Sequence, residues 1–181
     1  MEFVSRRFVS NLPISIRNTL LIRLHSADYE REQKLRWQDR FPGVELDDGR
    51  SNIEDLIAQS RLYISTYNAT TFLESFTMNI PTVIFWNPDH WELRDSAIPY
   101  FEELEEVGIF HTSPESAALH MVQIWERLEE WWTEDKVQSA REKFCSSYSN
   151  LAENILDRIE VVLKEPFKKD EYYSCFFFIR S

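Results

Sequence analysis

The stretch "YISTYNATTFLES" places hydroxyl and amide side chains in a short turn between an apolar run and a helical segment. The polar residues of the turn and the helix start are Thr66, Asn68, Thr70, Thr71 and Glu74. Hydroxyls and backbone N–H groups there could bind a phosphate, and the Glu74 carboxylate could accept hydrogen bonds from ribose hydroxyls. The spacing of Thr71 and Glu74 also fits a capping box, with Asn79 and Pro81 ending the helix. Both interpretations remain open on sequence alone.

Arg23 and His25 form a second candidate pair in "LIRLHS", near the end of another apolar run. Because residues two apart share one face of a strand, the guanidinium and the imidazole would lie together and could grip a phosphate or a carboxylate. The alternative is an Arg23 paired with a nearby acid such as Asp47, beside a half-buried His25 that makes one hydrogen bond.

The third candidate is the loop "WNPDHWELRDSA", which is denser in aromatic and ionisable groups than a simple connection requires. We expect five of its side chains to contact a substrate: Trp86, Asn87, Trp91, Glu92 and Arg94. An aromatic face could stack on a base or sugar, and Glu92 joins His25 as a candidate for acid/base catalysis. The alternative is a surface loop whose tryptophans fold back on the core.

Other chemistries are disfavoured by what the chain lacks. It contains no Ser/His/Asp arrangement, and with only three glycines it has no phosphate-binding glycine motif. It also has no His or carboxylate spacing that predicts a metal site or a cofactor. A net charge of −11 argues against a nucleic-acid partner. Two distant cysteines, with no signal peptide and no membrane-spanning run, favour a cytoplasmic location and leave peripheral membrane contact open.

Strand and helix patterns alternate along the first two thirds of the chain, and these elements must position the candidate residues. Strands are predicted over 20–24, 43–47, 62–66, 82–86 and 109–111. Helices are predicted over 28–41, 51–60, 71–78 and 97–107, the second with Ser51 as its N-cap. Continuous apolar strands favour a buried parallel sheet. We therefore predict a Rossmann-like three-layer α/β/α fold with a mostly parallel sheet of about five strands, followed by C-terminal helices.

The domain prediction is a single domain over 1–165 without a second core. Residues 1–18 lead into it, and helices over 114–165 follow the sheet, with Trp125, Trp131 and Trp132 expected at helix contacts. The aromatic tail 166–181 has no place in the sheet, so we expect it either to bind a partner or to be disordered.

The strings "YNATTFLES", "NIPTVIFWNP", "WELRDSA" and "GIFH" carry a family resemblance. Residues from about 20 to 148 resemble the C-terminal, nucleotide-sugar-binding half of a GT-B-type glycosyltransferase, and more narrowly the transferases of bacterial surface-carbohydrate (O-antigen) biosynthesis. The resemblance implies that the turn approaches the donor phosphates, that Glu74 holds the donor ribose, and that Arg23 and His25 occupy a strand end where related transferases carry a basic residue and a histidine. The turn departs from the family pattern because it has no glycine.

A GT-B enzyme places its active site between two Rossmann-like domains, and this chain has room for only the donor-binding one. The resemblance therefore implies a truncated transferase, or a subunit that needs an N-terminal acceptor domain or a partner. It also implies a metal-independent reaction with a nucleotide-sugar as donor substrate. The alternatives are a non-catalytic Rossmann-like scaffold module and half of a nucleotide-sugar epimerase.

Overall fold

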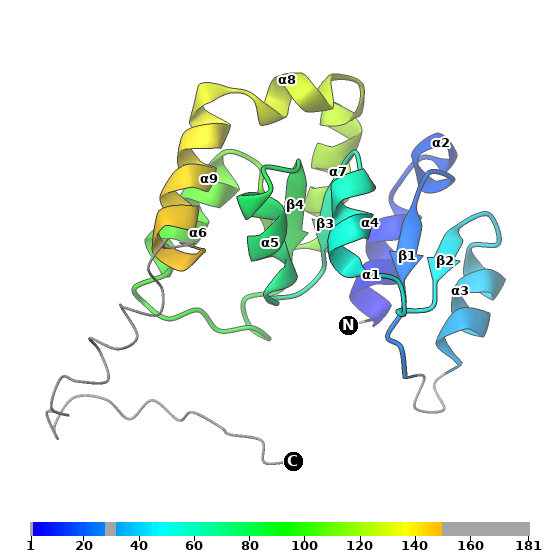
Figure 1. Ribbon diagram of the computed structural model, residues 1–181. Coiled ribbons are helices and arrows are strands. Elements are labelled where there is room, and N and C mark those ends of the chain that lie inside the picture. Colours follow the sequence, from blue (N-terminus) through cyan, green and yellow to red (C-terminus); the bar gives the residue numbers. More distant parts are fainter. Residues whose placement is uncertain (1, 28–31, 150–181) are drawn as a thin grey trace, which may run out of the picture. The chain divides into compact units, whose positions relative to one another are not determined.

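The computed structural model describes residues 2–27 and 32–149, in which helices alternate with parallel strands (Figure 1). The chain divides into two units, Met1–Ser149 and Asn150–Ser181, and every described residue lies in the first. The predicted end of the last helix, beyond 149, and the aromatic tail 166–181 lie outside the described residues.

Five strands are found in the described part of the chain, and every pairing between them is parallel, as predicted. β1 (Leu21–Arg23) pairs with β2 (Glu45–Asp47) in one sheet. The second sheet has the order β3 (Tyr63–Ser65), β4 (Thr82–Phe85) and β5 (Phe110–His111). The five predicted strands are thus present, divided between a two-stranded and a three-stranded sheet. β1 is short and exposed at both ends, so it is not a buried central strand.

Helices cover both faces of the larger sheet, which gives the predicted three layers around β4. The side chain of Phe85 stacks on Phe8 of α1 (Glu2–Ser10), with ring centroids 5.0 Å apart. The next residue, Trp86, packs on the opposite face against Phe101 of α6 (Ile98–Glu106) and Phe72 of α5 (Thr71–Thr77). Helix α7 (Pro114–Ile124) contacts α1, β4 and β5 (Figure 1). All four residues of β4 are consequently buried.

Residues 1–18, predicted only to lead into the domain, form α1 and the short α2 (Ile14–Arg17). Four apolar side chains of this segment are buried in the common core: Phe8, Val9, Leu12 and Ile16. An ion pair of 2.6 Å joins Arg7 to Glu115 at the start of α7. The segment therefore belongs to the domain and closes one side of its core.

The helical region after Pro114 is divided more finely than predicted. After α7 come a 3-10 turn (Trp125–Arg127), α8 (Leu128–Trp132) and α9 (Asp135–Tyr148). Trp131 and Trp132 are buried as predicted, and their indole N–H groups donate to the backbone oxygens of Val107 and Asn79. Both oxygens lie in the turns that end α6 and α5, so α8 covers these helix ends.

Around the smaller sheet, α3 (Gln33–Arg40) and α4 (Ile53–Gln59) form where helices were predicted. The N-cap of α4 is Asn52, whose side-chain oxygen accepts from the N–H groups of Glu54 and Asp55. The prediction of Ser51 as the cap was wrong by one residue, because its hydroxyl instead donates to Asp47 at the end of β2.

Candidate functional site

The predicted capping box at the start of α5 does not form. Thr70 is the N-cap and makes no side-chain cap bond, whereas Thr71 is already helical. The Thr71 hydroxyl oxygen accepts a 2.9 Å hydrogen bond from the hydroxyl of Tyr63 on β3. Glu74 does not return to the helix start: its Oε2 is buried and has no hydrogen-bond partner in the described part of the chain. Local capping therefore does not explain this carboxylate.

Glu74 belongs to a group of polar side chains between β3 and α5. Burial raises the pKa of Tyr63 above its usual value, the nearby Thr71 and Ser65 hydroxyls oppose this rise, and the charges of Tyr67 and Glu74 add to it. Thr71, Ser65, Tyr67 and Glu74 thus lie within electrostatic reach of Tyr63, and we call these five residues the Tyr63 cluster. The cluster holds four hydroxyls beside one carboxylate oxygen that lacks a donor.

The turn between β3 and α5 is fixed from two sides. Ser65 is buried, and its hydroxyl donates to the backbone oxygen of Tyr67 at 3.0 Å. Thr66 accepts a 3.3 Å hydrogen bond from Ser5 of α1, so its hydroxyl faces that helix. Asn68 is half-buried and Thr70 is exposed. Of the four predicted polar residues in the turn, Thr66 and Thr71 are held by neighbouring elements, which leaves Asn68 and Thr70 open to a ligand.

The loop after β4 splits into a core part and an exposed part. Trp86, predicted to contact a substrate, is 1% exposed and surrounded by aromatic rings, so the structure places it in the core. This corrects the prediction, because a ring packed on all sides cannot stack on a ligand. Asn87 accepts from the N–H of Asp89 in a local turn. Glu92 and Arg94 are exposed and make no side-chain hydrogen bond or ion pair to any other described residue.

Trp91 connects this loop to the turn before α5. Its ring is half-buried against the core, and its centroid lies 6.1 Å from that of Tyr67. The structure thereby brings together two of the three predicted stretches at the carboxyl ends of β3 and β4. This is the edge at which open parallel sheets bind their ligands.

Arg23 and His25, the remaining predicted stretch, lie at the end of β1 in the smaller sheet. The Arg23 guanidinium donates to Asp47 at 2.9 Å and to the backbone oxygens of Gly49 and Ser51. His25 Nδ1 lies 3.1 Å from both the backbone nitrogen and the backbone oxygen of Ala27. Arg23 thus takes the structural role weighed as the alternative, and a substrate-binding role for either residue stays a prediction.

Sequence reasoning missed Tyr63, Ser65 and Tyr67 as members of the site. A signal for two of them was present, since alternation along "YIS" puts Tyr63 and Ser65 on one face of β3. That face lies under α5, which the sequence does not reveal without the packing.

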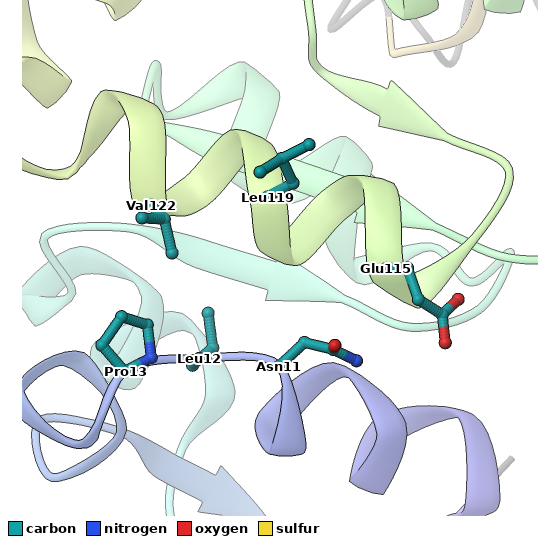
Figure 2. A pocket seen from close by; sticks show the side chains of 6 residues that line it. All are labelled: Asn11, Leu12, Pro13, Glu115, Leu119 and Val122. Carbon is teal, nitrogen blue, oxygen red and sulfur yellow. The ribbon is translucent and has the colours of Figure 1, made fainter.

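A surface hollow of about 450 Å³ lies elsewhere, between the loop joining α1 to α2 and helix α7 (Figure 2). Figure 2 shows Val122 of α7 facing Leu12 and Pro13 of that loop. None of the predicted site residues lines it. Among the described residues, no group of three His, Cys, Asp or Glu side chains could hold a metal ion, and no helix there is long and apolar enough to span a membrane.

One comparison with known proteins identifies the family. A sequence model described as "LIC12162 family transferase" matches residues 4–163. The chain belongs to this family. The match includes the strands, the Tyr63 cluster and the loop after β4, so the candidate site of this LIC12162 family transferase lies inside the matched region. Neither the curated proteins nor the solved structures gave a match.

Proposed function

We propose that this chain is the donor-binding part of a glycosyltransferase or sugar-phosphate transferase of bacterial surface-polysaccharide (O-antigen) biosynthesis, with a nucleotide-sugar as donor. The family is one of transferases, and the sequence resemblance to GT-B enzymes supplies the donor class. The observation that carries the proposal is the buried Oε2 of Glu74 in the first turn of α5, which has no hydrogen-bond partner among the described residues. A buried carboxylate oxygen without a donor is costly, and a ligand hydroxyl would satisfy it.

In this proposal, Glu74 accepts hydrogen bonds from the donor ribose. The Thr71 oxygen already accepts from Tyr63, so the Thr71 hydroxyl proton is directed elsewhere and can be donated to the same ligand. Asn68 and Thr70 supply further polar groups on the open side of the turn. Hydroxyls and amides there replace the glycines of the usual GT-B turn.

The exposed part of the loop after β4 would contact the rest of the donor. The exposed Arg94 guanidinium, which has no ion pair within the described part of the chain, could neutralise a leaving phosphate, and Asn87 and Glu92 offer hydrogen-bond partners to a sugar. Glu92 is also the better placed of the two acid/base candidates, because Trp91 joins its loop to the Tyr63 cluster whereas His25 lies on the smaller sheet. An N-terminal acceptor domain or a partner subunit would complete the active site.

Isothermal titration calorimetry with UDP-, GDP-, CMP- and dTDP-linked sugars tests the proposal. We expect one base class to bind and Glu74→Gln to weaken that binding at least tenfold, because the amide loses the charge that strengthens the bonds to the hydroxyls. The matched control is Glu105→Gln, an exposed glutamate on α6, which should bind as the wild type does. An absence of binding at millimolar donor, or an unchanged affinity of Glu74→Gln, would refute the donor site.

A further inference from the structure

Tyr67 places an aromatic ring on the surface at the edge of the Tyr63 cluster. Its side chain is 37% exposed, although the neighbouring Ser65 is buried. The Ser65 hydroxyl holds the backbone oxygen of Tyr67, so the ring projects from a fixed point of the turn. An exposed ring on an anchored backbone binds a flat ligand with little ordering cost.

Trp91 supplies a second ring from a different loop. The centroids of Tyr67 and Trp91 are 6.1 Å apart, with an angle of 41° between the ring planes. Trp91 is packed against the core on one side, which fixes the pair in position. Tyr67 thus contributes one ring from the turn before α5, and Trp91 contributes the other from the loop after β4.

We propose that Tyr67 and Trp91 form an aromatic platform on which the nucleobase of the donor stacks, and that Tyr67 determines how tightly the base is held. This inference rests on the proposed function. It assigns to Tyr67 a base-binding role that neither the family match nor the sequence motifs give.

The position of Glu74 favours the base over the sugar as the stacked group. Glu74 is in the first turn of α5 and Tyr67 is in the turn that leads into this helix, so both border the start of α5, where the proposed function places the ribose. In a nucleotide-sugar the base is attached directly to the ribose, whereas the sugar is one or two phosphates away. A base also presents a planar π face, while the many hydroxyls of a sugar need polar partners such as Asn87, Glu92 and Arg94.

The test compares two substitutions of Tyr67 in the full chain. Tyr67→Phe keeps the ring, and Tyr67→Leu keeps an apolar side chain without a π face. We expect Tyr67→Phe to bind within twofold of the wild type and Tyr67→Leu to bind about five- to tenfold more weakly. Tyr148→Leu is the matched control, because Tyr148 is 40% exposed and also packs against another ring, in α9.

The nucleoside monophosphate of the preferred base, which lacks the sugar, identifies the stacked group. Equal weakening of monophosphate and nucleotide-sugar binding by Tyr67→Leu is the expected result. A loss confined to the nucleotide-sugar would place the sugar on the ring and overturn the inference, as would a Tyr67→Leu protein that binds like Tyr148→Leu. If the wild type binds no nucleotide-sugar, the proposed function fails first and the platform fails with it.

Discussion

The hydroxyl of Tyr63 donates a 2.9 Å hydrogen bond to the hydroxyl oxygen of Thr71, and this contact joins β3 to the first turn of α5. It replaces the local cap that Thr71 would otherwise make. The bond also orients the Thr71 hydroxyl, since an oxygen that accepts from Tyr63 must send its own proton elsewhere. The Tyr63–Thr71 hydrogen bond thus holds the start of α5 on β3 and leaves the Thr71 hydroxyl as a hydrogen-bond donor in the same helical turn as Glu74.

Removing the Tyr63 hydroxyl should weaken the fold modestly. We expect Tyr63→Phe to lower the free energy of unfolding by about 1 kcal/mol, the usual contribution of one such bond. Urea unfolding of Tyr63→Phe, Thr71→Val and the double variant should show a coupling energy of similar size. Tyr100→Phe on α6 is the control, because the Tyr100 hydroxyl bonds no other described residue. Additive effects would mean that the contact contributes no stability.

Glu74 should show a conflict between stability and binding. Glu74→Met keeps the length of the side chain and removes the buried acceptor, so we expect the unliganded protein to gain about 1 kcal/mol of unfolding free energy. Donor binding should be lost in the same variant. Urea unfolding together with calorimetry measures both effects, and a clear loss of stability would show that the carboxylate already has a favourable partner in the fold.

The stability of the domain should fall between pH 7 and pH 5 because of His111. Burial, with a smaller effect from His120, lowers the pKa of His111 from 6.5 to about 4. As the pH falls, His111 is therefore protonated near pH 6.5 in the unfolded chain but only near pH 4 in the folded protein. The contribution of His111 to the free energy of unfolding is fully present above pH 6.5 and is lost as the pH falls toward 4. Up to about 2 kcal/mol of it is lost by pH 5.

Urea unfolding at pH 7, 6 and 5 checks this dependence, with His111→Asn as the variant that should flatten it. Asparagine keeps a donor for the Gly108 oxygen, which His111 Nε2 contacts at 3.0 Å. Burial also lowers the pKa of His120, so a smaller slope of the same sign should persist in the variant. Asp47 does not interfere, because its pKa is lowered from 3.8 and it titrates in stronger acid. A wild-type stability that is equal at pH 7 and pH 5 would contradict the prediction.

Arg23 should matter for stability more than Arg94 does. Its guanidinium contacts three oxygens at the end of β2 and in the loop that follows it, and the side chain of its partner Asp47 is only 7% exposed. We expect Arg23→Ala to destabilise the protein by about 2 kcal/mol, because a nearly buried carboxylate loses its counter-charge. Arg94→Ala should stay within about 0.5 kcal/mol of the wild type while weakening donor binding. Thermal or urea unfolding of both variants measures the two stabilities. Equal stabilities of Arg23→Ala and Arg94→Ala would contradict the structural role of Arg23.

Two helix starts show where sequence reasoning reached its limit. Ser51 and Thr71 both have a glutamate three residues on, and this local pattern predicts a cap at Ser51 and allows one at Thr71. In the structure each hydroxyl instead bonds a strand residue, Asp47 in one case and Tyr63 in the other. A cap and a tertiary hydrogen bond compete for the same hydroxyl, and no local pattern tells which partner lies closer.

The alternation of strand and helix, the parallel pairing and the polar turns after the strands are readable from the residues alone, because they follow from local apolar runs and turn residues. The division of the strands into two sheets, the burial of Trp86, the contact of Tyr67 with Trp91 and the bond of Tyr63 to Thr71 emerge only once the chain is folded. Those outcomes depend on which faces pack together across long separations in the chain, and burial of a side chain is a property of that packing.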